Sequence, residues 1–184
     1  VEEVMFFKNG DYVIDYKVKS KTNDNYTISH KVDFSFNGNE SVLFDNKKGA
    51  RVYKGTSIED ANTWMGFAKN DFVAEGKIRD SEKVNFVTLS MLENLDMKAI
   101  FPKRIEIYGK SNDRWLPINQ LEIALQDHPD DRKSYFKEFT LAVNLDGYNE
   151  VKIVAVNHFK FPKAPVYDRK RKYSWIFIDE VIFW

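Results

Sequence analysis

Short runs of β-branched and aromatic residues recur along almost the whole chain, separated by polar segments or by Gly, Pro and Asn. Runs of this kind favour extended strands. No window of useful length repeats its apolar residues at intervals of three and four, the spacing of an amphipathic helix. We therefore predict an all-β protein, with strands at Phe72–Ile78, Val84–Leu92, Arg104–Tyr108, Phe136–Val143, Val151–Val156 and Ser174–Phe183. Only short helical turns are expected, at Ile58–Met65 and Leu121–Leu125.

The N-terminal segment carries its own strong turn signal. Asn9-Gly10 stands between two β-prone runs, and a two-residue Asn-Gly link favours a tight hairpin. We expect residues 1–25 to form a hairpin that is either an added edge of the sheet or the end of a preceding domain. Residues 26–184 are expected to form one β-sandwich, because a chain of 184 residues supports a single sizeable core.

Charge and hydropathy exclude several kinds of partner. Lysine plus arginine and aspartate plus glutamate number 28 each, so no net field attracts nucleic acid or an anionic membrane. No stretch approaches the roughly 20 apolar residues of a membrane helix. We therefore predict no nucleic-acid partner and no membrane insertion. The chain opens at Val1 without a signal-like segment, so we expect it to be a mature or excised piece.

Catalytic motifs are missing from the sequence. There is no nucleophile elbow, zinc-binding helix motif or phosphate-cradling glycine loop, and the three histidines are widely scattered. With no cysteine, thiol nucleophiles and disulfides are excluded. The chain is therefore expected to have no catalytic residues.

The run from Trp175 to Phe183 is apolar on both alternating faces except at Asp179 and Glu180. Such a strand is expected to be buried on two sides and to bring carboxylates with it. A buried carboxylate needs a cationic side chain, backbone N–H groups or a hard cation such as calcium. A salt bridge at a strand end is equally consistent with Glu180.

Asp45 opens a loop whose composition would let backbone carbonyls surround an ion, with Gly49 able to take a positive φ. An ordinary turn has the same composition. Since calcium needs six to eight oxygens, the two carboxylates that the sequence offers do not define a site alone.

Three long connections stand out, at Asn46–Asn62, Glu93–Pro102 and His158–Lys172. The last mixes aromatics, prolines and a basic run, a composition that suits sugar recognition by flat rings and polar side chains. Its aromatics could equally cap the core and its basic run could be solvated. The same residues suit single-stranded nucleic acid, which the neutral charge of the chain disfavours.

Four segments, in order, resemble the discoidin-like (coagulation factor 5/8 type C) domain, a relative of family 32 carbohydrate-binding modules. They are Leu43-Phe44-Asp45 leading to Gly49, Trp64–Phe67, Phe101–Asp113 and Tyr173–Val181. The likeness is closest to the version at the C-terminus of bacterial family 20 β-hexosaminidases and related glycoside hydrolases, and it covers roughly Tyr26 to Trp184. It implies a galactose-binding-like jelly-roll β-sandwich.

The resemblance also implies a site assignment. One structural calcium would be held by Asp45 and Glu180, and a glycan containing galactose or N-acetylhexosamine would bind at loops on one end of the sandwich. The stacking candidates are Phe161 and Tyr167, and the polar candidates are Asn94, His158 and Arg169.

Three departures from the family pattern affect this assignment. Asn46 stands where relatives have glycine, Lys77-Ile78-Arg79 replaces Asp-Leu-Gly, and the His158–Lys172 loop lacks a tryptophan and a second histidine. The identity of the sugar is therefore not carried over.

The resulting expectation is a non-catalytic glycan-binding module of a secreted bacterial glycoside hydrolase, located outside the cell, in the periplasm or on the outer surface. An attached or adjacent catalytic domain would be its partner. The alternative is a structural accessory domain that packs against a catalytic domain without binding sugar. An enzyme would require convergent groups in a deep pocket.

Overall fold

The computed structural model describes residues 3–8, 11–16, 26–28, 40–45, 47–49, 63–95, 98–125, 134–160 and 173–184. Within these residues strands dominate, and the helical elements described are two short 3-10 turns, η2 (Glu40–Phe44) and η3 (Ser81–Lys83). The strands are β1 (Glu3–Lys8), β2 (Asp11–Tyr16), β3 (Tyr26–Ile28), β4 (Met65–Ala68), β5 (Phe72–Ile78), β6 (Phe86–Glu93), β7 (Arg104–Ser111), β8 (Arg114–Glu122), β9 (Tyr135–Ala142), β10 (Glu150–Val156) and β11 (Trp175–Phe183).

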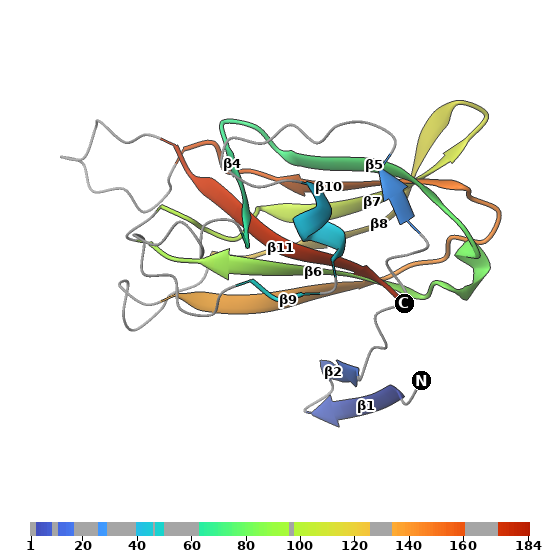
Figure 1. Cartoon of the computed structure of the whole chain (residues 1–184), viewed down its shortest axis with the longest axis horizontal. Helices are drawn as coiled ribbons and strands as arrows, with labels where there is room; N and C mark the ends of the chain where they lie inside the picture. Colours follow the sequence, from blue (N-terminus) through green and yellow to red (C-terminus); the bar gives the residue numbers. More distant parts are fainter. Residues whose placement is uncertain are drawn as a thin grey trace.

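Two antiparallel sheets face each other (Figure 1). The five-stranded sheet has the order β3-β5-β10-β7-β8, and the four-stranded sheet has the order β4-β11-β6-β9. Strands that are distant in sequence are therefore neighbours, as in a jelly roll. Asn119 on β8 donates a 2.7 Å hydrogen bond to the carbonyl of Ala142 on β9 and so links the two sheets along one edge. The predicted jelly-roll β-sandwich is confirmed.

The five-stranded sheet buries one face. Along β7 and β10, buried and half-buried residues alternate, so Ile107 and Ile153 point into the core while their neighbours face outward. This is the period of two that a strand with one solvated face requires.

The central strands of the four-stranded sheet are buried on both faces, as predicted for Trp175–Phe183. The pairing of β11 with β6 steps from Ile178–Met91 to Glu180–Ser90, which leaves Asp179 as the extra residue of a β-bulge. The bulge changes the phase of the strand, so even-numbered residues before it and odd-numbered residues after it reach the same central core.

The six predicted strands correspond to β5, β6, β7, β9, β10 and β11. The helical turn predicted at Leu121–Leu125 is wrong, because Leu121 and Glu122 end strand β8 and the next three residues are not helical. The turn predicted at Ile58–Met65 is wrong at its end, since Met65 begins β4; residues 58–62 lie outside the described part. The segment before Asp45 is the 3-10 turn η2 rather than a core strand.

At the N-terminus, β1 pairs with β2 in antiparallel register from Glu3–Tyr16 to Lys8–Asp11, which confirms the predicted hairpin. Tyr26 begins β3, the first strand of the five-stranded sheet. The division at residue 25 remains a prediction. None of the helices in the described residues is both long enough and apolar enough to cross a membrane.

Candidate functional site

Strand β10 ends and strand β11 begins at the end of the sandwich drawn on the left of Figure 1. Residues 157–160 and 173–175 form the base of the β10–β11 connection, which we call the loop base. Within it, Lys160 and Tyr173 pair as an isolated antiparallel bridge. Asn94 and Ala99 form a second bridge, and Ala99 pairs with Trp175 at the start of β11. Two of the three connections singled out from the sequence therefore meet at this end of the sandwich.

Asn157, completely buried, holds this end together. Its Nδ2 lies 3.1 Å from the carbonyl oxygens of Phe67 and Asn70 and 3.4 Å from that of Ser174. Its Oδ1 accepts hydrogen bonds from the Ser174 hydroxyl at 2.7 Å and from the Phe159 N–H at 3.1 Å. The Asn157 side chain thus links the β4–β5 turn to both sides of the loop base. These hydrogen bonds fix the backbone positions of the neighbouring residues.

Two aromatic side chains project from this base. Phe159 is 41% exposed and Tyr173 is 46% exposed, so both rings present surface to solvent. Phe159 has a φ of 60°, a left-handed conformation that is costly for an aromatic residue. The ammonium of Lys69 lies 4.5 Å from the centroid of the Tyr173 ring, an arrangement that orients the ring by a cation–π contact.

Two of the three polar residues predicted for sugar binding, Asn94 and His158, turn inward. Asn94 is only 6% exposed, and its Nδ2 donates a 2.9 Å hydrogen bond to the Ser134 hydroxyl. His158 is half-buried, and its Nε2 is buried without a hydrogen-bond partner in the described part of the chain. Burial, followed by the charge of Lys103, lowers the pKa of His158 despite a hydrogen bond with the backbone of Phe101. The ring is therefore neutral near pH 7.

Phe161, Tyr167 and Arg169 lie outside the described residues, so their assignment stays a prediction. Phe159 and Tyr173 were not selected from the sequence, although both belong to the same aromatic-rich segment. Composition finds the segment, whereas the exposure of a given ring depends on the bridge and the Asn157 network.

The predicted calcium residues occupy different environments. Asp45 is exposed, and its Oδ1 accepts a 2.8 Å hydrogen bond from the N–H of Lys47, as in a local turn. Glu180 and its neighbour Asp179 are each only 1% exposed. Asp179 accepts a 2.6 Å hydrogen bond from the N–H of Gly49 through Oδ2, and a backbone N–H is one of the partners expected from the sequence for a buried carboxylate on this strand.

Gly49 is a close-approach position. A Cβ built on it would lie 2.5 Å from Trp64 Cε2 and 2.9 Å from the carbonyl oxygen of Thr63. Gly49 therefore lies directly against the buried Trp64 indole, and its N–H is bonded to Asp179. Within the described residues, no three Asp, Glu or His side chains are grouped closely enough to hold a metal on their own, so a cation here would need backbone carbonyls as further ligands.

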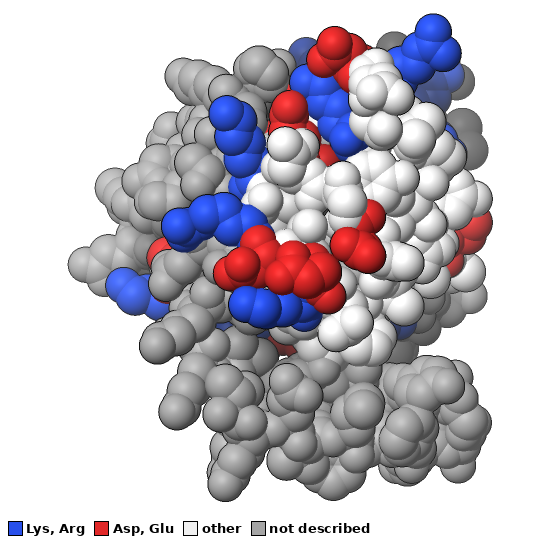
Figure 2. Space-filling view, turned by 90° about the vertical axis from the view of Figure 1, so that its right-hand side faces the viewer, with Lys and Arg blue, Asp and Glu red and all other residues white. Residues whose placement is uncertain are grey.

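The opposite end of the sandwich, which faces the viewer in Figure 2, differs in character. Acidic and basic side chains lie beside one another there within a largely uncharged surface. The described part of this end therefore has no patch of a single sign that would select a charged polymer.

Neither a family model nor a curated protein matches the sequence. Among solved structures, the GH31 CBM32-2 module bound to GalNAc superposes with a TM-score of 0.52 at 11% identity, covering 87% of this chain and 97% of that one. The family 32 module of C. perfringens NanJ in complex with galactose gives a TM-score of 0.47 at 11% identity, covering 88% and 95%. CBM32-3 from a family 31 glycoside hydrolase of Clostridium perfringens gives 0.48 at 9% identity, covering 92% and 99%.

The first of these matches shows the fold, and the resemblance to discoidin-like, family 32 modules is confirmed at that level. All three neighbours are carbohydrate-binding modules rather than catalytic domains.

Proposed function

We propose that this protein is a non-catalytic glycan-binding module whose sugar site lies at the base of the β10–β11 connection. The observation that carries the proposal is the pair of exposed aromatic side chains, Phe159 and Tyr173, on a base that buried Asn157 holds rigid. Exposed rings on a fixed support offer flat apolar faces to the C–H side of a pyranose at little entropic cost.

Further contacts are proposed from the sequence-predicted residues. Phe161 and Tyr167 would add stacking surface, and Arg169 would reach hydroxyl groups. Asn94 and His158 would act indirectly, because the hydrogen bonds of Asn94 with Ser134 and of His158 with the backbone of Phe101 hold the loops around the sugar. The fold shared with a module bound to GalNAc makes galactose and N-acetylhexosamines the first sugars to try.

A glycan array probed with the calcium-loaded protein tests the proposal. We expect hits among glycans with terminal galactose or N-acetylhexosamine, and we expect Tyr173→Ala to lose them. Leu116→Ala is the matched control, because Leu116 is 41% exposed on β8, away from the loop base. If no glycan on a broad array binds, the result would instead favour an accessory domain whose exposed aromatic side chains pack against another domain.

The proposed setting is a secreted bacterial glycoside hydrolase, with the module outside the cell, in the periplasm or on the outer surface and attached to a catalytic domain. Support comes from the fold, which a module of a family 31 glycoside hydrolase shares. Expression of the full-length parent gene and assay of its culture supernatant for glycosidase activity would test this setting.

One structural calcium ion is a second part of the proposal. Two successive acidic side chains on β11 are each 1% exposed, and one of them, Asp179, accepts a hydrogen bond from the Gly49 N–H of the adjoining loop. A bound cation would lower further the cost of burying their charge. Asp45 and Glu180 would hold the ion together with loop carbonyls. A bound calcium would supply positive charge that ties the loop to β11.

Calcium removal tests this part. We expect the melting temperature to fall when a chelator is added, because an ion that binds only the folded state stabilises it by mass action. Glu180→Gln should abolish the calcium-dependent shift, whereas Glu82→Gln, an exposed acid in η3, should retain it. An equal response to chelator in both variants would contradict the assignment.

A further inference from the structure

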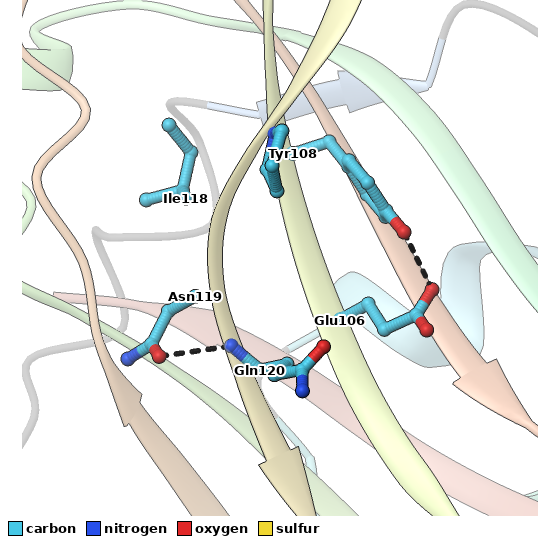
Figure 3. A pocket seen from close by; sticks show the side chains of 6 residues that line it. Glu106, Tyr108, Ile118, Asn119 and Gln120 are labelled. Atoms are coloured by element: carbon cyan, nitrogen blue, oxygen red, sulfur yellow. Dashed lines mark hydrogen bonds between the residues drawn. The ribbon is translucent and has the colours of Figure 1, made fainter.

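The outer face of the five-stranded sheet carries a hollow of about 240 Å³, separate from the loop base. Its lining comes from β7 and β8: Glu106, Tyr108, Pro117, Ile118, Asn119 and Gln120 (Figure 3). A β-bulge forms it, because the register steps from Ile107–Asn119 to Tyr108–Pro117 and leaves Ile118 as the extra residue. Bulges re-aim side chains and interrupt the ladder locally, and Pro117 contributes no backbone N–H.

A fixed carboxylate lies at one side of the hollow. Glu106 accepts a 2.7 Å hydrogen bond from the Tyr108 hydroxyl through Oε2, and Arg104 donates to Oε1 through Nε. Partial burial raises the pKa of Glu106, but these hydrogen bonds and the charges of Arg104 and Lys152 outweigh it, so the pKa lies below its ordinary value. The carboxylate is therefore ionised and held in one orientation at neutral pH.

This carboxylate retains acceptor capacity. An ionised carboxylate accepts about four hydrogen bonds, and the Tyr108 and Arg104 contacts use two of them. Gln120 is exposed, and its side chain extends from β8 toward β7, the strand that carries Glu106, so its amide adds a donor and an acceptor to the lining of the hollow (Figure 3). The rings of Tyr108 and Pro117 provide apolar surface. Acceptors, a donor and apolar rings together match the hydroxyl groups and C–H face of a sugar.

The surrounding charges select the ligand class. Arg104 compensates the charge of Glu106, and the ammonium of Lys152 lies 4.9 Å from the Tyr108 ring centroid, on the same face. An amine would meet these two cations, and an anion would meet the carboxylate. Because charges of both signs lie beside the hollow, it disfavours amines as well as anions, and a neutral, polyhydroxylated ligand suits it best.

We propose that this hollow is a second binding site, for a neutral saccharide, on the face of the five-stranded sheet. It is independent of the loop-base site, because none of its residues belongs to that base. A module with both sites would bind two units of a branched or multivalent glycan and gain avidity over either site alone.

Chemical-shift mapping of backbone amides in the native protein tests this proposal, with galactose, N-acetylgalactosamine and glucose as separate probes. At least one sugar should shift the amides of 106–108 and 118–120 in a saturable way. Glu106→Gln should weaken that response at least about tenfold, as expected for loss of a charge-assisted hydrogen bond. Gln120→Ala should weaken it too. The control is Glu75→Gln, an acid on β5 of the same sheet outside the hollow, which should respond like the native protein.

Inorganic phosphate and methylamine serve as charged probes and should leave these amides unmoved. The proposal is overturned if no sugar shifts them, if a charged probe shifts them instead, or if Glu106→Gln responds like the native protein. The loop-base site is read separately, from the amides of 157–160 and 173–175 and from Tyr173→Ala. A failure at one site is therefore distinguishable from a failure at the other.

Discussion

The outer faces of the two sheets differ in burial and polarity. On the five-stranded sheet, the outer face of β7 and β10 carries half-buried charged side chains such as Glu106 and Lys152. On the four-stranded sheet, the outer face of β6 and β11 is buried and includes Leu92 and Phe177, which pack with Trp64 in a second, smaller core. The outer face of the five-stranded sheet therefore presents polar side chains, whereas the outer face of the four-stranded sheet is buried in the second core.

The largest expected effect comes from removing a ring on the covered face. Phe177→Ala should lower the free energy of unfolding by about 3–5 kcal/mol, because a buried aromatic leaves a cavity when truncated. Val154→Ala, on the outer face of the five-stranded sheet, should cost about 1 kcal/mol or less. Urea unfolding of both variants measures the difference. Equal losses would mean that the two outer faces are not distinct.

A smaller effect is expected where the loop meets the covered face. Gly49→Ala should destabilise by about 1–3 kcal/mol through overpacking, since its Cβ would lie 2.5 Å from the Trp64 indole. Combining it with Trp64→Phe, which removes part of that indole, should cost less than the sum of the two single changes. A double-mutant cycle from thermal unfolding measures this coupling. Strict additivity would contradict the close contact.

The smallest expected effect is a pH dependence at the loop base. Because the pKa of His158 is lowered by folding, the unfolded chain binds more protons below the ordinary value of 6.5. Stability should therefore be fully present above about pH 6.5 and should fall as the pH drops from there toward the folded pKa. His158→Gln should flatten this part of the profile, measured by urea unfolding over the same pH range. An unchanged slope would show that another group is responsible.

Sequence patterns predicted the strands that have a clear burial pattern. β5 was predicted to the residue, because buried and outward-facing positions alternate from Phe72 to Ile78. β8 was missed, because it is largely exposed and contains Pro117 together with a bulge. It therefore lacks the alternating apolar period that makes other strands visible in a sequence.

The sequence named five candidate sugar-binding residues, and the two rings that the structure exposes at the loop base, Phe159 and Tyr173, were not among them. Aromatic composition identified the His158–Lys172 segment, but the inward turn of His158 and the exposure of Tyr173 depend on contacts between distant positions. Asn157, for example, bonds to the carbonyl of Phe67, 90 positions away. Long-range hydrogen bonds of this kind leave no periodic signal in the sequence. The geometry of the loop could therefore be obtained only from the structure.

Calorimetric titration of galactose and N-acetylgalactosamine into native protein, Tyr173→Ala and Phe159→Ala tests the central claim most directly. The account predicts saturable binding of at least one sugar to the native protein. It also predicts at least about tenfold weaker binding, equivalent to 1.4 kcal/mol, in each variant with an unchanged melting temperature. Undiminished binding by both variants, or no saturable binding to the native protein, would contradict it.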